Sequence, residues 1–397
     1  MRVMMLSWEY PPHTVGGLGR HVAELVPALV KQGVDLHVVT PRWAGGEHRE
    51  ESGRLSVHRV DPPIAPMPDF HTGVWRTNIR LEEAGGRLCQ EQNIELIHDH
   101  DWLTAFSSAA LKRSFKVPLL STIHATEMGR SRGNLASARQ RAIHSAEWWL
   151  TYESWRVIAC TDFMASEIAT YFQAPRDKID VIPNGVNSER FARWEGMDLT
   201  RFRSMYALSE EQIVFYVGRI VQEKGLHVLV EAVPQVLAEN SRAKFVIAGT
   251  GPMLDRLRAR AWELGVGAKV LFTGFISDED RDRLYKVASC AVFPSLYEPF
   301  GIVALEAMAA RTPVVVSEVG GLREVVKHGK TGITVHPGSA RSLAWGINHT
   351  LIRPDWAEQR AQDAYQVARR EYNWESVARR TVQVYERVIA ERAQTDW

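Results

Sequence analysis

The sequence predicts an α/β protein built from two Rossmann-like domains, each a parallel sheet with crossover helices. Short runs of β-branched and apolar residues alternate with helical segments along the chain, which is the pattern of parallel sheets. A connector near residues 190–206 lacks strand signals and interrupts the alternation once. We therefore expect an N-terminal domain over residues 1–195 and a C-terminal domain over residues 196–374. In such folds the active site lies in a cleft at the carboxyl ends of the strands.

The N-terminal half begins with a strand, Val3–Leu6, a glycine-rich loop at 16–19, and a helix, Arg20–Gln32, that stops at Gly33. Turn residues at 183–185 close the last strand of this half. Short apolar runs predict its remaining strands: Leu36–Thr40, Leu55–Val60, Leu96–His98, Leu119–Ile123, Val157–Cys160 and Ile179–Ile182.

The C-terminal half repeats this plan, with a helix over Gly225–Glu239 and a second glycine turn at 249–252. Its strands are expected at Val214–Val217, Phe245–Ala248, Val270–Phe272, Cys290–Phe293, Val314–Val316 and Gly332–Val335. The tail from Glu375 to Arg392 has the pattern of one amphipathic helix, which the pattern alone does not place.

Composition and charge restrict the function. The chain has 397 residues, 45% hydrophobic and 24% charged, which is typical of a soluble protein of two or three domains. A net charge of +1 argues against a nucleic-acid partner. Cys89, Cys160 and Cys290 have no paired spacing, so we expect buried free thiols in a reducing compartment. Since no apolar run resembles a signal peptide or a membrane span, a cytoplasmic location is expected.

One local feature leaves a peripheral contact with the inner face of a membrane open. A basic cluster precedes three tryptophans: Arg130, Arg132, Arg139 and Arg141, then Trp148, Trp149 and Trp155. A membrane-surface helix has this composition. Because Glu147 and Glu153 interrupt the pattern, we favour a helix with an aromatic core face and a solvated basic face.

Glu298 and Glu306 are the most informative pair in the chain. A proline and a glycine follow the first glutamate and mark a loop that opens an apolar helix over 302–310. Glu298 then lies near the positive end of this helix and Glu306 about two turns inside it. Two carboxylates beside free helix-end amides suit the hydroxyls and diphosphate of a nucleotide sugar. The alternative is a capping glutamate and an exposed helix glutamate.

Cations and glycines near the predicted strand ends extend this set. Gly218 and Arg219 end a strand and Lys224 begins the next helix, so two cations flank a short loop and can hold a diphosphate from two sides. Two solvated loop cations are the alternative. The loop at 16–19 lets backbone approach a ligand, although it lacks the spacing of a dinucleotide fingerprint.

Histidines and aspartates cluster at the end of another predicted strand. On a strand, His98 and His100 share one face while Asp99 and Asp101 share the other, which divides the candidate ligands of a metal ion. Without a third ligand at a convincing spacing we predict no metal site, and expect these side chains to bond each other or an acceptor. His124 follows a strand, where α/β sheets carry functional side chains.

Together these motifs resemble the family 4 retaining glycosyltransferases of the GT-B fold over nearly the full chain. The motifs are residues 16–19, 124, 183–186, 218–219, 223–225, 249–252, 294–295, 298–306 and 320–321. Residues 7–12, 100–102 and 125–127 look like the branch that contains glycogen-synthase-like and polysaccharide-assembly enzymes. In this family the final helix crosses back to the N-terminal domain, which would place residues 375–397 there.

The resemblance implies a role at each matching position. Arg219 and Lys224 would neutralise the donor diphosphate, Glu298 would hold the donor-sugar hydroxyls, and His124 would contact the donor sugar. Glu306 would hold the ribose hydroxyls. Further implied donor-binding positions are Gly16, Gly17, Gly218, Gly249, Gly251, Phe275, Ile276, Phe300, Gly301, Ile302 and Val303, and implied acceptor-side positions are Asp101, Trp102 and Glu127.

The implied reaction is retaining transfer of a hexose from a nucleotide-diphosphate sugar, with UDP- or ADP-glucose favoured, to a hydroxyl of a glycan or lipid-linked acceptor. No metal or other cofactor is implied, because cations and helix-end amides can stabilise the leaving diphosphate. Two alternatives remain open: a nucleotide-sugar epimerase, and a nucleotide- or glycan-binding protein without catalysis.

Overall fold

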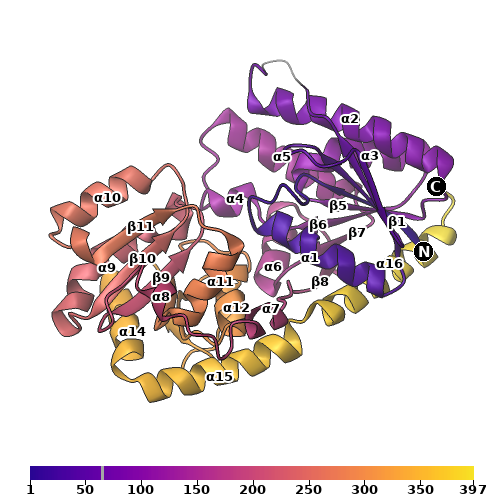
Figure 1. Ribbon diagram of the computed structural model, residues 1–397. Helices are drawn as coiled ribbons and strands as arrows, with labels where there is room; N and C mark the ends of the chain where they lie inside the picture. The colour runs from indigo at the N-terminus through magenta and orange to yellow at the C-terminus, as the bar shows by residue number, and fades with distance from the viewer. Residues whose placement is uncertain (64–66) are drawn as a thin grey trace. The chain divides into compact units, whose positions relative to one another are not determined.

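The computed structural model describes residues 1–63 and 67–397, which form two compact units (Figure 1). Unit 1 comprises Met1–Gly185 and Trp374–Trp397, and unit 2 comprises Val186–Asn373. Each unit contains one sheet with helices on both faces. The sequence connects the units twice, because the last helix returns to unit 1.

The described residues of unit 1 form an eight-stranded sheet in the order β3-β4-β2-β1-β5-β6-β7-β8. Its strands are β1 (Arg2–Ser7), β2 (Asp35–Pro41), β3 (Arg49–Ser52), β4 (Leu55–Val60), β5 (Leu96–His100), β6 (Leu119–Ile123), β7 (Arg156–Ala159) and β8 (Ile179–Val181). All neighbours are parallel except β3 and β4. The apolar pattern did not predict β3, because its four residues are polar and exposed.

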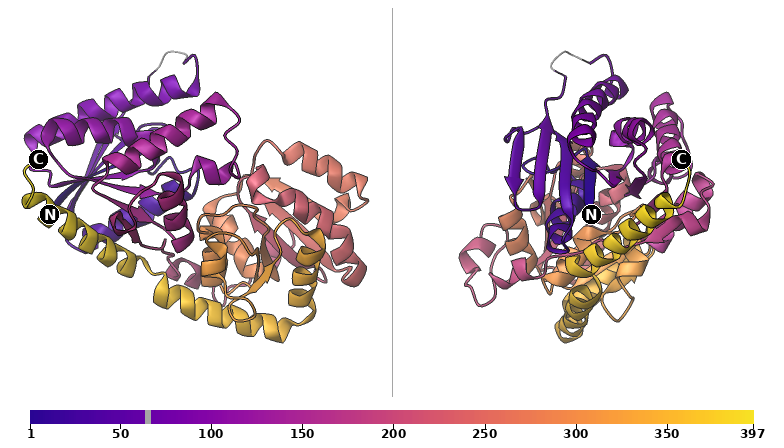
Figure 2. Two further views of the ribbon diagram at one scale, coloured as in Figure 1. Left: turned by 180° about the vertical axis from the view of Figure 1, so that it is seen from behind. Right: turned by 90° about the vertical axis from the view of Figure 1, so that its right-hand side faces the viewer.

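Helices cover both faces of this sheet (Figures 1 and 2). They are α1 (Gly17–Lys31), α2 (Phe70–Glu91), α3 (Ala105–Phe115), α4 (Glu127–Arg130), α5 (Ala138–Glu153), α6 (Asp162–Tyr171) and α16 (Trp374–Ala393), with short 3-10 turns at Trp102–Thr104 and Arg176–Lys178. Val3 and Met5 of β1 join one core with α1 and α16. Met4 points the other way, toward Gly85 of α2.

The C-terminal helix is part of the core of unit 1. Val377, Val384, Tyr385 and Val388 of α16 are buried and pack with Leu25 and other residues of α1. Their spacing places them on one side of a helix. The predicted return of this helix to the N-terminal part of the chain is therefore confirmed.

The described residues of unit 2 form a six-stranded parallel sheet in the order β11-β10-β9-β12-β13-β14. Its strands are β9 (Gln212–Val217), β10 (Ala243–Ala248), β11 (Val270–Gly274), β12 (Cys290–Phe293), β13 (Val314–Ser317) and β14 (Ile333–Val335). Its helices are α7 (Glu189–Ala192), α8 (Thr200–Arg203), α9 (Leu226–Glu239), α10 (Leu254–Glu263), α11 (Asp278–Val287), α12 (Ile302–Ala309), α13 (Leu322–Val325), α14 (Ala340–Ile352) and α15 (Pro354–Glu371), with 3-10 turns at Gln222–Lys224 and Gly267–Lys269.

Both sheets reverse their strand order once, which is what positions a ligand site in α/β folds. In unit 1 the reversal lies between β1 and β5, and in unit 2 it lies between β9 and β12. Loops after such strands diverge in opposite directions, so side chains there face open space at the carboxyl edge. The predicted α/β class with two parallel sheets is confirmed, and these two switch points locate the candidate site residues.

The helix that carries the tryptophans and two other segments allow local predictions to be compared with the structure. Trp148 of α5 is 44% exposed, whereas Trp149 packs against Phe106 and Trp155 against the core of unit 1, so the predicted aromatic core face holds only in part. The connector forms the short helices α7 and α8. Cys160 and Cys290 are buried free thiols, as predicted, while Cys89 is half-buried.

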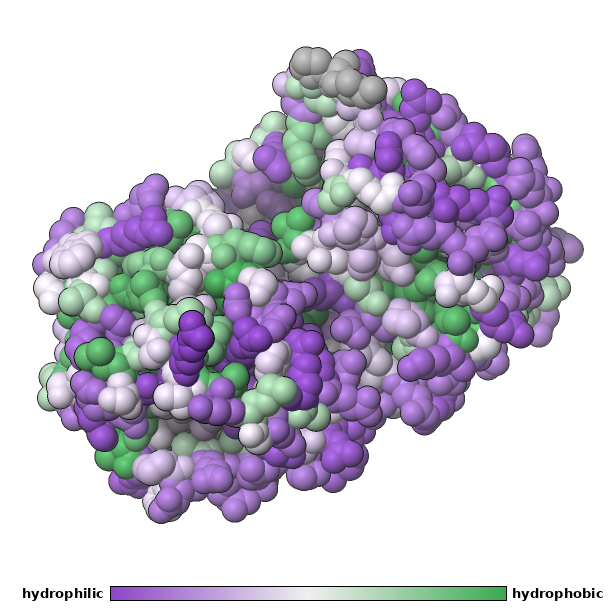
Figure 3. Space-filling view, in the orientation of Figure 1, coloured by the Kyte–Doolittle hydropathy of each residue, from purple (hydrophilic) through white to green (hydrophobic). Residues whose placement is uncertain are grey.

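The surface of unit 1 is largely hydrophilic on the face shown in Figure 3. None of the helices in the described part of the chain has both the length and the apolarity that a membrane crossing requires.

Candidate active site

Lys224 and Glu298 form an ion pair at the switch point of unit 2. Lys224 Nζ lies 2.7 Å from Glu298 Oε2. The hydroxyl of Ser295 donates to the same carboxylate oxygen at 3.2 Å. Glu298 is 7% exposed, so the pair is largely removed from water, where a charge–charge contact is less screened than at the surface.

A close backbone contact fixes this pair. Gly225 follows Lys224 with a φ of +69°, and a Cβ atom there would lie 1.9 Å from the carbonyl oxygen of Pro294. Leu296 N–H also donates to the carbonyl of Glu223 at 2.8 Å. The loop after β9 therefore lies directly on the loop after β12. Only glycine permits both the left-handed backbone and the approach.

The glycine turns of unit 2 pack against each other. Gly249 has a φ of +136°, and a Cβ atom there would lie 1.9 Å from the carbonyl oxygen of Gly218. Gly251 approaches Ile220 in the same way, with a Cβ-to-oxygen distance of 2.3 Å. Arg219 lies in sequence between Gly218 and Ile220, the two residues that Gly249 and Gly251 contact. Its half-exposed guanidinium lies 3.4 Å from the carboxylate of Glu223. The glycines thus hold the loop that carries Arg219.

The backbone N–H groups at the N-terminus of α12 are open to a ligand. Gly301 is the N-cap residue with a φ of +102°, and no side chain caps this end. The loop is held because Gly321 N–H donates to the Glu298 carbonyl at 2.9 Å. Phe300 is buried beside the ring of Tyr372, so its side chain belongs to the core. Phe275, in contrast, is 84% exposed after β11.

Glu306 lies in a buried charge network. Its carboxylate is 2.9 Å from Nη2 of Arg190 and 3.9 Å from Nε of Arg281, and Tyr285 donates to it at 3.3 Å. Burial alone would lower the pKa of Arg190, but the carboxylates of Glu306 and Asp282 raise it above its ordinary value. The guanidinium stays charged and orients Glu306.

In unit 1, the glycine loop already binds a carboxylate of the chain itself. Glu9 Oε2 accepts hydrogen bonds from the N–H groups of Val15 at 2.8 Å and Gly16 at 3.1 Å. A Cβ atom at Gly19 would lie 2.4 Å from this oxygen. The start of α1 is therefore an anion site, as expected for a helix N-terminus, and Glu9 occupies it.

Four histidines gather near the end of β5. His98 and His100 share one face of the strand, with ring centroids 4.3 Å apart, as predicted. His98 bonds Tyr385 of α16 at 2.7 Å, whereas His100 Nδ1 lies 3.1 Å from Nε2 of His124. His21 of α1 packs edge-on against the His124 ring at 4.7 Å. Burial lowers the pKa of His124 to about 4, so its ring is neutral at pH 7.

The predicted acceptor-side residues lie beside this cluster. Asp101 Oδ1 accepts from the His124 N–H at 2.7 Å, and burial raises the pKa of Asp101 to about 7. The carboxylate of Glu147 accepts from the Glu127 N–H at 2.9 Å, and burial raises the pKa of Glu147 to about 8. Trp102 is 5% exposed, so its ring is part of the core.

The structure thus brings Lys224 and Glu298 together in unit 2, and Asp101 and His124 together in unit 1. Sequence reasoning missed three supporting residues. Arg190 orients Glu306, His21 packs against His124, and Glu9 binds the glycine loop. Arg190 lies in the connector, and its partner is 116 positions away, so no local signal pointed to it. The signal for His21 was its place in the first turns of the helix after the glycine loop.

Comparison with known proteins agrees with this geometry. Residues 15–190 match the family described as Glycosyltransferase Family 4, and residues 200–367 match the family described as Glycosyl transferases group 1. An uncharacterized glycosyltransferase of Methanocaldococcus jannaschii is 40% identical, over 97% of this chain and 98% of that relative. A glycogen synthase of Mycobacterium tuberculosis is 35% identical, over 97% of this chain and 94% of that enzyme.

Solved structures share the fold along the whole chain. Sucrose-phosphate synthase from Thermosynechococcus elongatus superimposes with a TM-score of 0.83 at 24% identity, covering 98% of this chain and 99% of that one. The Anabaena protein HepE in complex with UDP-glucose gives a TM-score of 0.76 at 19% identity, covering 97% and 99%. The chain therefore belongs to glycosyltransferase family 4 and is a nucleotide-sugar-dependent retaining glycosyltransferase with the GT-B fold.

Proposed function

We propose that this enzyme transfers glucose, with retention, from UDP- or ADP-glucose to a hydroxyl of a glycan. Unit 2 binds the nucleotide sugar and unit 1 carries the acceptor side. The observation that carries the proposal is the Lys224–Glu298 pair at the switch point of unit 2, with the uncapped N-terminus of α12 beside it. A pair of opposite charges beside free amides matches a ligand that is anionic at one end and rich in hydroxyls at the other.

Departure of the diphosphate is the costly step, and cations lower its cost. Lys224 and Arg219 neutralise the phosphates, while the N–H groups of Ile302 and Val303 at the start of α12 donate to the phosphate and sugar. Glu298 holds the sugar hydroxyls, since its carboxylate retains lone pairs beyond those used by its partners. The leaving phosphate takes the proton of the acceptor hydroxyl.

The nucleoside end of the donor uses other parts of unit 2. Glu306 accepts the ribose hydroxyls, with Arg190 fixing the orientation of its carboxylate. The exposed ring of Phe275 and its neighbour Ile276 lie against the base. Gly218, Gly249 and Gly251 act through the loop geometry described above.

Roles in unit 1 follow from its own geometry. His124 contacts the donor sugar as a neutral imidazole, oriented by Asp101 through its backbone N–H. Gly16 and Gly17 approach a phosphate or the acceptor, which requires Glu9 to release the Gly16 N–H. Trp102 and Glu127 support the acceptor side.

A groove of about 370 Å³ in unit 1 suits a glycan acceptor. Trp8 and Trp43 line it with ring centroids 5.2 Å apart, and Phe70 lies on its wall. Flat aromatic rings with a polar edge offer apolar area for sugar faces at a small entropic cost. Asp69 at the same wall caps α2 through Thr72 and retains lone pairs on its carboxylate for sugar hydroxyls.

A panel of donors and acceptors tests the proposal. UDP-glucose, ADP-glucose and GDP-mannose are each incubated with the enzyme alone, with a maltooligosaccharide, or with a lipid-linked acceptor, and released nucleotide and elongated product are measured. Glucose transfer to the oligosaccharide is expected. Transfer only from GDP-mannose, or only to the lipid-linked acceptor, contradicts the proposed donor or acceptor.

A further inference from the structure

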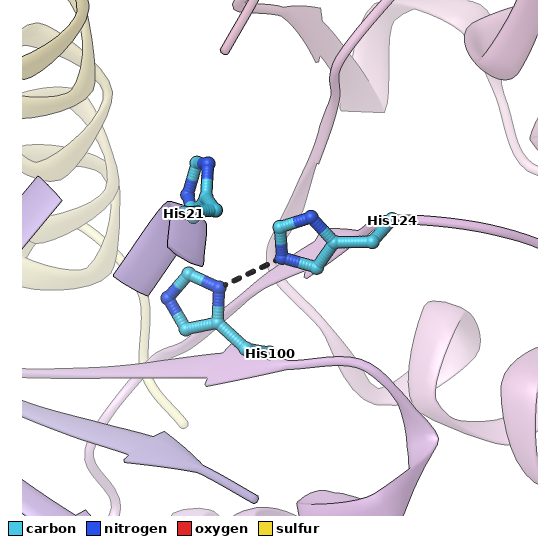
Figure 4. A group of neighbouring side chains, drawn as sticks. All are labelled: His21, His100 and His124. Carbon is cyan, nitrogen blue, oxygen red and sulfur yellow. Dashed lines mark hydrogen bonds between the residues drawn. The ribbon is translucent and has the colours of Figure 1, made fainter. Parts of the chain in front are cut away.

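Three histidine side chains of unit 1 converge at the carboxyl end of the sheet (Figure 4). His21 comes from α1, His100 ends β5, and His124 follows β6. Each offers one ring nitrogen, and these three nitrogens lie within 4.8 Å of one another. Across residues 1–63 and 67–397, no other set of three or more His, Cys, Asp or Glu side chains meets this spacing.

His21 is prepared as a ligand. Its Nδ1–H donates to the amide oxygen of Asn184 at 2.7 Å, which leaves the lone pair on Nε2. His21 is only 5% exposed, and its buried Nε2 atom has no hydrogen-bond partner. An imidazole held through one nitrogen by an oxygen acceptor, with the other nitrogen bare, is the arrangement that metal-binding histidines have.

His100 and His124 are close to the separation that a shared metal ion requires. Their facing nitrogens are 3.1 Å apart, and two nitrogens bound tetrahedrally to Zn²⁺ at about 2.0–2.1 Å lie roughly 3.3 Å apart. The apo pair shares one proton in its hydrogen bond. Binding requires this proton to move to the other nitrogen of the same ring, because both facing nitrogens must offer lone pairs to the ion.

The surroundings decide which side chains take part. His98 does not, because Tyr385 and Thr122 engage both of its ring nitrogens. The carboxyl of Asp101 accepts a hydrogen bond from the backbone N–H of His124 and so fixes the position of this ligand.

We propose that His21, His100 and His124 form a site for Zn²⁺ or a similar borderline divalent cation, with water in the fourth position. The ion is not part of the transfer reaction. It inhibits, because a liganded His124 no longer contacts the donor sugar, and this inhibitory part rests on the role proposed above for His124. The site departs from the expectation of no metal, which was based on the missing third ligand that α1 supplies.

Direct binding is tested without activity. The full chain, purified with EDTA and then freed of it, is titrated with Co²⁺ while the visible d–d absorption of a low-symmetry site is recorded, and Zn²⁺ is then added to displace it. One Co²⁺ per chain, displaced by Zn²⁺, is expected. His21→Gln should abolish the spectrum. His37→Gln should not, because His37 belongs to a two-histidine contact with His58 elsewhere in unit 1. No Co²⁺ spectrum for the wild type overturns the site.

A second variant covers the case in which His21→Gln fails to fold. Asn184→Ala removes the oxygen that holds Nδ1 of His21, so Co²⁺ affinity should fall about 10–100-fold. Unchanged affinity contradicts the ligand role of His21. In the transfer assay, EDTA alone should leave the wild-type rate unchanged and Zn²⁺ should lower it. Binding without inhibition overturns only the inhibitory part, and absence of transfer with every donor overturns the proposed function while the Co²⁺ result stands.

Discussion

At the residue scale, the proposed function divides the work of the Lys224–Glu298 pair between diphosphate and sugar. Each side chain has a partner in the structure, so removing either one changes the other's environment as well as the ligand contact. The two substitutions below therefore affect different steps.

Replacing Glu298 by Gln should lower kcat on the order of 10²-fold or more, because a preorganised charge at the reacting sugar is lost. Nucleotide affinity should change little, since Gln keeps the shape and an acceptor oxygen. Steady-state kinetics and UDP or ADP titration by calorimetry measure the two effects. Glu231→Gln, on the exposed side of α9 beside Arg260, is the matched control. Wild-type turnover in Glu298→Gln would remove this carboxylate from the reaction.

Replacing Lys224 by Ala should weaken diphosphate binding by about 1.5–3 kcal/mol, the range for hydrogen bonds to charged groups. The same titration measures it, with UDP compared with uridine so that the loss is assigned to the phosphates. Lys330→Ala, at an exposed lysine of the same unit, is the control and should leave affinity unchanged. Equal losses for UDP and uridine would place the effect outside the diphosphate.

Residue identities at these positions were predictable, and their supporting contacts were not. Glu298, Lys224 and His124 sit in short motifs at strand ends, where chain order alone places them near a carboxyl edge. Arg190 and His21 meet their partners through tertiary packing across 116 and 163 positions, which no local pattern encodes.

At the scale of elements, the start of α9 depends on one glycine. The loop before it touches the loop after β12 through backbone atoms, and this contact sets the distance between the two charged side chains. Short continuous apolar runs predicted the strands, because a parallel strand that is buried on both faces is apolar at nearly every position. The polar edge strand β3 gave no such signal.

A matched pair of glycine variants separates backbone strain from close contact. Gly225 and Gly265 have nearly equal φ values, +69° and +72°, but a Cβ atom at Gly265 meets nothing within 4 Å. Gly265→Ala should cost about 1–2 kcal/mol of unfolding free energy, from the left-handed backbone alone. Gly225→Ala should cost about 1–3 kcal/mol more, because it also clashes with Pro294.

Urea unfolding of both variants measures the difference in unfolding free energy. UDP affinity should fall only in Gly225→Ala, because only this substitution displaces the loop that carries Lys224. Equal costs for the two variants would show that the contact with Pro294 relaxes freely.

At the scale of the whole molecule, buried acids make the stability of unit 1 depend on pH. Burial raises the pKa values of Asp99 and Glu147 to about 8 and that of Asp101 to about 7. Above about pH 6.5 the unfolded chain has released these protons and the folded chain retains them, so the free energy of unfolding should fall as the pH rises toward 8. Histidine titration in the unfolded chain acts in the opposite direction, and mainly below this window.

Glu147→Gln removes one of these protons and keeps an acceptor for the Glu127 N–H. The decline between about pH 6.5 and 8 should become shallower by up to about 1.4 kcal/mol per pH unit. Urea unfolding across this range measures it, with Glu83→Gln on the exposed side of α2 as the control. A slope equal to that of the wild type would show that Glu147 is ionised in the folded state.

The position of α16 in the core of unit 1 also sets the order in which the two units can fold during synthesis on the ribosome. Unit 2 is continuous in sequence and can close as soon as its last strand and helices have emerged. Unit 1 is begun first but waits, because the Tyr385 partner of His98 is made 287 residues later. Until then the apolar face that α16 covers is exposed, so the first half of the nascent chain is the part more prone to aggregation.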